Sequence, residues 1–361
     1  MKIGILTYHR SQNYGALLQA RAMQEYLRSL GHDTYFIDYW PKYSSDVYKP
    51  FALERFMKLS YITKVKYCIR ALLIFIRQSI RAERTNKFIE NYLTVSDARE
   101  FDAVIYGSDQ IWRKQRSSET GYFNPIYFGN NYVFASKKIA YAASMGKIEI
   151  DTIEDVEFIK KYLQNFSSLS VREKQLQNVL QSKTNIDVSL VLDPVFLLTR
   201  NQWLSFINKE IIPDYKYIFY YRLAPLKETD IIVETLVKKT GYKVIEMRGY
   251  MPNFKFGQRY KMTSDARDFL SYLTHAEYVV TSSFHGTALS TIMGKQFYCY
   301  CKSGISDRLT SLLSILNLSD RFITKCFDKI EINNIIDYSV VDKIREERAV
   351  ISRLWLNKSL S

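Results

Sequence analysis

Short apolar runs alternate with longer amphipathic segments along most of the chain. The short runs are rich in Val, Ile, Leu, Phe and Tyr, a composition typical of strands. In the longer segments, apolar residues recur at spacings of three and four, which predicts helices with one buried face. The regular alternation of the two element types predicts an α/β fold built on mostly parallel sheets.

The pattern divides the chain into two similar halves. In the first half, strands are expected at 2–7, 34–39, 102–106, 138–143, 168–171 and 187–192, and helices at 14–30, 151–165 and 173–182. In the second half, strands are expected at 216–221, 242–247, 277–282 and 296–301, and helices at 226–240, 265–275, 287–294 and 307–317. Two Rossmann-like, doubly wound domains that face each other across a cleft would account for this order.

The expected domains are 1–195 and 196–335. The first carries a basic helical insertion over 45–95 and is expected to hold the acceptor side of the cleft. Residues 195–214 show no clear periodicity, so we interpret them as the interdomain connection. A last charged helix, within 336–361, is expected to pack back on the first domain.

Positive charge is concentrated in one segment. The net charge of the chain is +14, and residues 49–88 hold ten lysines and arginines against two glutamates, a local balance of 10 − 2 = +8. This excess implies an anionic partner, such as a membrane surface, a lipid-linked phosphate or a nucleic acid. We expect no nucleic-acid partner, because no recognised binding motif accompanies the charge.

Within this segment, the helix expected over 62–84 has two adjoining stripes. One stripe is apolar, and the other consists of Lys66, Arg70, Arg77, Arg81 and Arg84. This pattern is typical of a helix that lies in a membrane interface. A helix that packs its apolar stripe on the domain and leaves a solvated basic edge would show the same pattern.

The remaining global features favour a cytoplasmic protein. No segment is apolar enough to span a bilayer, and residues 1–6 predict a strand rather than a secretion signal. The four cysteines, Cys68, Cys299, Cys301 and Cys326, show no metal-ligand spacing. We expect them to be reduced thiols.

The most informative segment is Thr281-Ser282-Ser283-Phe284-His285-Gly286-Thr287, which joins an expected strand to an expected helix. Open α/β sheets bind ligands at such strand ends. The amides of Gly286 and Thr287 are expected to open the helix and to attract an anion. His285 can then contact a phosphate or transfer a proton near neutral pH. The alternative is a histidine that only caps a helix in a satisfied turn.

Two loops of the first half follow strands in the same way. Asn13 and Gln19 offer amides suited to sugar hydroxyls, and Gly15 between them allows a close backbone approach. In Gly107-Ser108-Asp109-Gln110-Ile111-Trp112, the carboxylate could act as a base on a hydroxyl, with an amide and an aromatic ring beside it to contact a sugar. Plain helix or turn capping is the alternative for both loops.

Arginines also lie at strand ends or helix starts. Arg172 and Arg222 end or follow expected strands, and Arg308 opens an expected helix. The guanidinium fork suits carboxylates and phosphates. Any one of these side chains could equally be solvated or paired, but three together favour a substrate with more than one negative charge.

Taken in order, these segments resemble the polysaccharide pyruvyl transferases. The resemblance extends from Asn13-Tyr14-Gly15 to Ser306-Asp307-Arg308. Between them lie Val104-Ile105-Tyr106-Gly107-Ser108-Asp109-Gln110-Ile111-Trp112, Tyr141-Ala142-Ala143-Ser144, Ser170-Val171-Arg172-Glu173, Val191-Leu192-Asp193-Pro194 and Ser283-Phe284-His285-Gly286-Thr287. Each segment alone is weakly specific, whereas their order and spacing together are strongly specific.

The resemblance implies a two-domain fold like that of GT-B glycosyltransferases, phosphoenolpyruvate as donor substrate and a sugar as acceptor. The implied product is a pyruvate ketal bridging two hydroxyls of one hexose, often galactose. Ketal formation requires no metal or cofactor, and the sequence shows no cluster of metal ligands. An acceptor linked to polyprenyl diphosphate would bring the protein to the inner face of the cytoplasmic membrane, with helix 62–84 toward anionic lipids.

Site residues are assigned on the same basis. The histidine of the family corresponds to His285, which we expect to contact phosphate and donate a proton, with Asp109 as base on the acceptor. The expected donor-binding residues are Arg172, Arg222, Ser283, Phe284, Gly286, Thr287 and Arg308. The expected acceptor-binding residues are Asn13, Tyr14, Gly15, Gln19, Ser108, Gln110, Trp112 and Ser144. Arg222 matches the family pattern only loosely.

Two other functions remain open at this point. A GT-B glycosyltransferase that uses a nucleotide sugar would share the fold and the phosphate-binding turn, although residues 288–294 contain no acid for a ribose. A non-catalytic protein that binds membranes or nucleic acid would explain the basic segment alone.

Overall fold

The computed structural model describes residues 1–41, 44, 61–115, 122–249, 257, 259–301, 307–324 and 330–361. Within 61–74, it describes the side chains of only Cys68 and Leu72. Several predicted features lie outside the described residues: residues 45–60 of the insertion expected at 45–95, Ser306, Cys326, and the side chains of Lys66 and Arg70. The other three cysteines are free thiols.

The first sheet is parallel and seven-stranded, in the order β3-β2-β1-β4-β5-β6-β7. Its strands are β1 (Lys2–Leu6), β2 (Asp33–Ile37), β3 (Val95–Ser96), β4 (Glu100–Tyr106), β5 (Phe134–Ala143), β6 (Ser168–Val171) and β7 (Ser189–Leu190). The chain builds outward from β1 in one direction and from β4 in the other. This reversal defines a doubly wound sheet, and the loops beside it are where such sheets bind ligands.

Helices α1 (Tyr14–Ser29), α4 (Tyr61–Tyr92), α5 (Ile153–Leu163) and α6 (Lys174–Thr184) connect these strands. Helix α1 begins where the Asn13 side chain accepts a hydrogen bond from the Gly15 amide. Most residues of α1 are buried, because the helix lies between the first sheet and elements of the second half. Asn13 is therefore a helix cap.

The second sheet is parallel and four-stranded, in the order β11-β10-β8-β9. Its strands are β8 (Tyr217–Arg222), β9 (Lys243–Arg248), β10 (Tyr278–Thr281) and β11 (Gln296–Cys299). Its helices are α8 (Lys227–Thr240), α9 (Ala266–His275), α10 (Phe284–Ile292) and α11 (Asp307–Ile315). The predicted α/β architecture with two doubly wound parallel sheets is confirmed.

The connection between the sheets is more ordered than its sequence suggests. It contains α7 (Arg200–Phe206), which starts in a capping box between Thr199 and Gln202. Seven residues are too few for a helical period to emerge, so the pattern missed it. Trp203 of this helix is fully buried and donates a hydrogen bond from Nε1 to the Val195 carbonyl oxygen.

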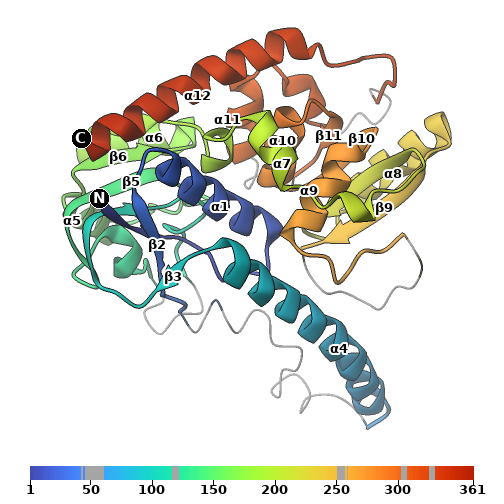
Figure 1. Cartoon of the computed structure of the whole chain (residues 1–361), viewed down its shortest axis with the longest axis horizontal. Coiled ribbons are helices and arrows are strands. Elements are labelled where there is room, and N and C mark those ends of the chain that lie inside the picture. Colours follow the sequence, from blue (N-terminus) through green and yellow to red (C-terminus); the bar gives the residue numbers. More distant parts are fainter. Residues whose placement is uncertain are drawn as a thin grey trace.

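The last helix, α12 (Tyr338–Leu360), crosses the molecule and ends against the first sheet (Figure 1). Ser352 Oγ accepts a hydrogen bond from the Leu192 amide at 2.9 Å. The Lys137 ammonium of β5 donates to the Leu360 carbonyl oxygen at 2.8 Å. A single apolar core cluster includes Ile3 of β1, Phe219 of β8 and Leu356 of α12, so both sheets and α12 share packing.

Helix α4 also joins the two halves, through a buried arginine. Arg81 is only 2% exposed, and its guanidinium donates to the carbonyl oxygens of Gln12 at 2.6 Å and Arg248 at 2.8 Å. Arg84 pairs with Asp268 of α9 at 3.0 Å. The expectation of an exposed basic stripe is therefore wrong for Arg81, whereas the Arg84 side chain is 39% exposed beside its partner. Helical periodicity shows that side chains share a face but does not show what covers that face.

We expect Arg81→Met to lower the free energy of unfolding by about 1–3 kcal/mol, because two carbonyl oxygens lose their donor. Lys87→Met is the matched control on the same helix: Lys87 pairs with Glu83 at 2.7 Å, but both side chains are exposed. That change should cost less than about 0.5 kcal/mol. Urea unfolding measures both, and equal costs would contradict the bridging role of Arg81.

Candidate functional site

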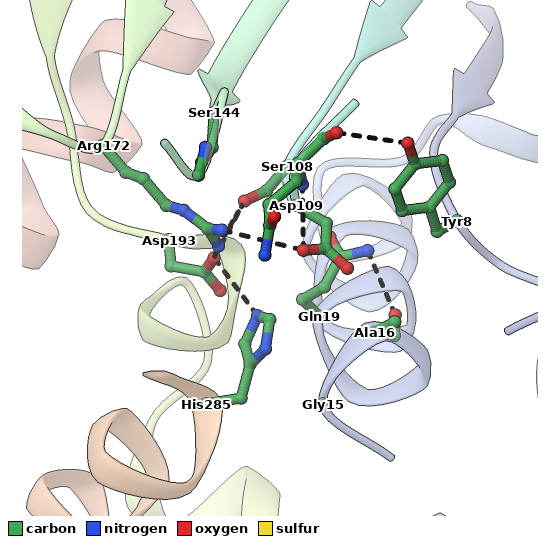
Figure 2. A network of polar contacts seen from close by, with 12 residues as sticks. Tyr8, Gly15, Ala16, Gln19, Ser108, Asp109, Ser144, Arg172, Asp193 and His285 are labelled. Atoms are coloured by element: carbon green, nitrogen blue, oxygen red, sulfur yellow. Dashed lines mark hydrogen bonds and ion pairs between the residues drawn. The ribbon is translucent and has the colours of Figure 1, made fainter. Parts of the chain in front are cut away.

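Polar side chains from both halves meet at the carboxyl ends of the parallel strands (Figure 2). Ser108 and Asp109 follow β4, Ser144 follows β5, and Arg172 follows β6. His285 enters from the start of α10, immediately after β10 of the second sheet. The predicted residues are thus brought together by the strand order rather than by closeness in sequence.

Asp193 lies at the centre of this cluster. Its Oδ2 accepts hydrogen bonds from the Arg172 guanidinium and from Ser108 Oγ, the latter at 2.8 Å. Its Oδ1 accepts from the Val195 amide at 3.1 Å. Burial alone would raise the pKa of this carboxyl, but His285 and Arg172 more than offset it and hold the pKa well below its usual value. Asp193 is therefore a buried carboxylate anion.

His285 is held close to this carboxylate. Its Nε2 lies 3.4 Å from Asp193 Oδ2, near enough for an ion pair when the ring is protonated, although the geometry is not that of a hydrogen bond. On its other side the ring contacts α1, where a Cβ added to Gly15 would lie 2.5 Å from His285 Nδ1. Glycine is required at position 15 because the two helix starts approach so closely.

Arg172, the partner of the Asp193 carboxylate, also contacts the second half. Its guanidinium lies over the Phe284 ring, 4.4 Å from the centroid, and its Nη2 is 3.7 Å from Asp109 Oδ1. The Asp109 backbone is left-handed, with φ of 61°, a conformation that few residues other than glycine adopt. Asp109 therefore sits in an unusual turn beside a buried cation.

Arg308 of α11 approaches the same cluster. With its amide oxygen toward Arg308, Gln110 accepts hydrogen bonds from both terminal nitrogens, at 2.9 and 3.0 Å. The Arg308 Nε has no partner among the described residues. Burial lowers the pKa of Arg308, and the charge of Arg172 lowers it further. An added anion would relieve this repulsion between neighbouring cations.

A second carboxyl group, Glu173, lies behind Arg172. It is 2% exposed and accepts a hydrogen bond from Ser144 Oγ. Burial raises its pKa more than the nearby Arg172, Ser144 and Arg308 lower it. The hydroxyl proton of Ser144 is thereby used within the protein. Both side chains belong to the first half and pack against the cluster.

The amides of Gly286 and Thr287 do not form an open anion site. Helix α10 begins at Phe284, earlier than expected, and Ser283 is its N-cap. The Gly286 amide donates to Ser283 Oγ at 3.2 Å, and the Thr287 amide donates to the Ser283 carbonyl oxygen at 3.0 Å. These donors are used within the helix, so the expected anion contact through them is wrong for this conformation.

Four other predicted residues lie away from the cluster or inside the core. Arg222 pairs with Asp230 of α8 at 2.9 Å. Trp112 is fully buried and stacks on Phe128, so it presents no face to a sugar. Tyr14 is 1% exposed and stacks on an aromatic ring of α9. The Gln19 amide is fully buried and donates to Thr7 Oγ1 at 2.9 Å.

Sequence reasoning assigned no role to Asp193 or Glu173. Both were visible inside the segments used for the resemblance: Asp193 directly follows the strand expected at 187–192, and Glu173 is the second residue after the strand 168–171. A rule that every acidic residue at a strand's carboxyl end is a candidate would have found them. Their burial could not be found in this way, because it results from the second half closing over the first.

The cluster is shut from solvent in this conformation. His285 is 4% exposed and Asp193 is 1% exposed. Gln110, Arg308 and Asn13 are partly exposed and form its rim. Access of a substrate to His285 is therefore restricted in this conformation.

We expect Asp193→Asn to lower the free energy of unfolding by about 3–5 kcal/mol, because it leaves the buried Arg172 charge without its main partner. Asp230→Asn is the matched control, since Asp230 also pairs with an arginine at a strand end but is 37% exposed. Its cost should stay below about 1 kcal/mol. Chemical unfolding of both variants checks the difference, and a cost for Asp193→Asn near that of the control would contradict the network.

The chain was compared with known sequences and with solved structures. A search of curated protein sequences finds no match. Among solved structures, the S. aureus MnaA–UDP structure is 12% identical, with a TM-score of 0.49 over 96% of this chain and 90% of that chain. The UDP-GlcNAc 2-epimerase from Neisseria meningitidis is 10% identical, with a TM-score of 0.46 over 98% and 99%. Protein KP1_0663 from Klebsiella pneumoniae is 18% identical, with a TM-score of 0.40 over 69% and 88%.

None of these structural similarities bears on a substrate or an activity. The sequence model of the family described as polysaccharide pyruvyl transferase, in contrast, matches residues 13–300. This match covers every strand of both sheets except β1, and every residue of the cluster except Arg308. The chain belongs to the polysaccharide pyruvyl transferase family.

Proposed function

We propose that this protein transfers the pyruvyl group of phosphoenolpyruvate to a hexose, with galactose as the expected acceptor, and forms a pyruvate ketal. The observation that supports this most is the contact between His285 of one half and the Asp193–Arg172 pair of the other, in a member of this family. This contact brings an imidazole ring to a buried carboxylate and two arginines, where the two halves meet.

The proposed donor carries a carboxylate and a phosphate, which call for fixed cations. Arg308 is the strongest candidate, because Gln110 is its hydrogen-bond partner in the described part of the chain and its Nε is unpaired. Arg172 is held by Asp193 and would act mainly through its charge. Arg222 would have to leave Asp230 first, so we rank it below the other two.

In the proposed reaction, two hydroxyls of one sugar add in turn to the same carbon of the donor. One acceptor hydroxyl adds to the central carbon of the donor, while His285 gives a proton to the methylene carbon, which becomes a methyl group. The C–O bond to phosphate then breaks, and a second hydroxyl of the same sugar attacks the resulting cation. In net terms, one hydroxyl proton restores the proton that His285 gave to the methyl group, the other leaves on the released phosphate, and no metal or redox partner is needed.

The protein side chains would divide this work by their positions. Asp193 would orient His285 and stabilise its protonated form, as a carboxylate commonly does for a catalytic histidine. Asp109, 8% exposed beside the rim, would accept the proton of the acceptor hydroxyl. Gln110 and Asn13 at the rim are the proposed acceptor contacts that a sugar can reach. Opening of the two halves would admit both substrates, and closure would exclude water.

We further propose that the acceptor is part of a polysaccharide repeat unit carried on polyprenyl diphosphate, and that the protein works in the cytoplasm. No helix in the described portion combines the length and apolarity needed to cross a bilayer.

Incubation with phosphoenolpyruvate and a panel of nitrophenyl hexosides tests the proposal directly. We expect phosphate release and a product heavier by one pyruvate ketal, detected by mass spectrometry. A thermal-shift comparison of phosphoenolpyruvate with nucleotide sugars accompanies it. Stabilisation by a nucleotide sugar alone would instead favour a glycosyltransferase.

We expect His285→Ala to lower the transfer rate by about 10²- to 10⁴-fold, the usual contribution of a general acid or base. His275→Ala is the control, since His275 ends the neighbouring helix α9, where its Nδ1 hydrogen-bonds to the Ser271 carbonyl oxygen of its own helix. Initial rates of phosphate release and thermal melting are measured for both. A His285→Ala enzyme that retains activity within a few-fold of the parent would exclude the proposed role.

We expect Arg308→Ala to raise the KM for phosphoenolpyruvate by roughly ten- to hundredfold, since a charge-assisted contact is worth about 1.5–3 kcal/mol. The KM for the acceptor should change little. Arg222→Ala serves for comparison and should have a smaller effect on the donor. The assignment of donor and acceptor sides would be reversed if Arg308→Ala changed the acceptor KM instead.

A further inference from the structure

One face of α4 exposes large apolar side chains. Leu72, Phe75, Ile76 and Ile80 are 61%, 53%, 50% and 41% exposed. Their spacings of three, one and four residues place them side by side along one face of a helix. A contiguous apolar face of this kind on a folded protein marks an interaction surface.

The charge of the same stretch is one-sided. Residues 61–80 contain Lys64, Lys66, Arg70 and Arg77 and no acidic residue. Acidic residues appear only further along the helix, at Glu83 and Glu90. On a wheel of 100° per residue, sequence positions 64 and 66 flank the apolar face, one on each side, and positions 70 and 77 lie farther round the helix. The stretch is therefore apolar on one face, with basic positions at its edges and beyond and no acid.

The other end of α4 is fixed to the body of the protein. Arg81 and Arg84 bind groups of both halves, as described above. The 20 residues from 61 to 80 extend about 30 Å beyond this attachment, at 1.5 Å per residue. In Figure 1 this end of α4 reaches past both sheets. The apolar face thus lies on a helix whose other end is anchored through Arg81 and Arg84.

We propose that residues 61–80 of α4 dock on the surface of an anionic lipid membrane, with the apolar face among the headgroups and acyl chains and the basic edge against lipid phosphates. Charge complementarity argues for this occupant over a second copy of the chain, since pairing two such faces would bring eight cations together without an acid. Charged residues are depleted at the cores of protein interfaces, whereas they flank the apolar face of interfacial helices.

This inference rests on the proposed function in one respect: membrane docking would bring the enzyme to a lipid-carried acceptor. Binding to vesicles is measured without any substrate, so the two proposals can fail separately. A protein that binds vesicles but transfers no pyruvate would overturn the proposed function alone. A protein that transfers pyruvate to a soluble hexoside but does not bind vesicles would overturn the membrane proposal alone.

The test is co-sedimentation with phosphatidylglycerol vesicles, with phosphatidylcholine vesicles for comparison. The full-length protein should prefer phosphatidylglycerol, and its affinity should fall as salt rises, because each basic residue near such a surface contributes roughly fivefold. Phe75→Glu with Ile76→Glu should weaken binding by about tenfold or more. The matched control is Ile351→Glu with Leu354→Glu on α12, where the side chains are 50% and 62% exposed. It should bind like the parent.

The parent and the two double variants should melt at similar temperatures and act equally on a soluble hexoside. Equal vesicle binding by the two double variants, or no binding by the parent at low salt, would overturn the proposal. Sedimentation velocity measures the oligomeric state and tests whether a second copy of the chain covers the face. A parent that is dimeric in solution, with a Phe75→Glu and Ile76→Glu variant that is monomeric, would assign the face to a second copy of the chain and also overturn it.

Discussion

The arrangement of the whole molecule depends on one buried anion. Asp193 follows the last strand of the first sheet, and its carboxylate accepts hydrogen bonds from Arg172 and Ser108 and lies beside His285 of the second half. A carboxylate in an apolar interior is unfavourable unless cations and donors surround it. The first half supplies the arginine and the serine, and the second half supplies the histidine. The charge is fully compensated only when the halves are together, so the same contact that would support chemistry also favours the closed arrangement.

The sequence predicted the elements well because the rules involved are local. Apolar runs such as Tyr278–Thr281 stay buried on both faces in a parallel sheet, and strand ends and glycine turns follow from backbone sterics. The strand-end rule also brought His285, Ser108, Arg172 and Arg308 to one place. The rule failed for Trp112. A tryptophan suits a sugar-binding surface and an apolar core equally well, and its burial depends on what packs against the loop. The rule overlooked Asp193 for the same reason, since one of the two groups that compensate its charge, His285, lies in the other half.

The arginines show how a residue type acquires its role from its surroundings. Arg81, Arg84 and Arg222 looked like members of ligand-binding or lipid-binding sets, yet each is held by a carbonyl oxygen or a carboxylate of the chain itself. Arg308 differs, because its nearest described partner is a neutral amide and its neighbour is another cation. The cation without a direct carboxylate partner among the described residues, rather than the number of arginines, indicates where an anion would bind.

The return of α12 to the first sheet has a consequence for how the chain is made. The Leu192 amide receives its acceptor from Ser352, 160 residues later, and Lys137 reaches a carbonyl oxygen 223 residues later. At about 5–20 residues per second, a ribosome needs roughly 8–32 s to add the first of these intervals. During that time the amino-terminal sheet has left the exit tunnel with part of its apolar surface uncovered. The nascent chain must therefore rely on chaperones or on transient local packing, and its first domain matures only when synthesis of α12 is complete.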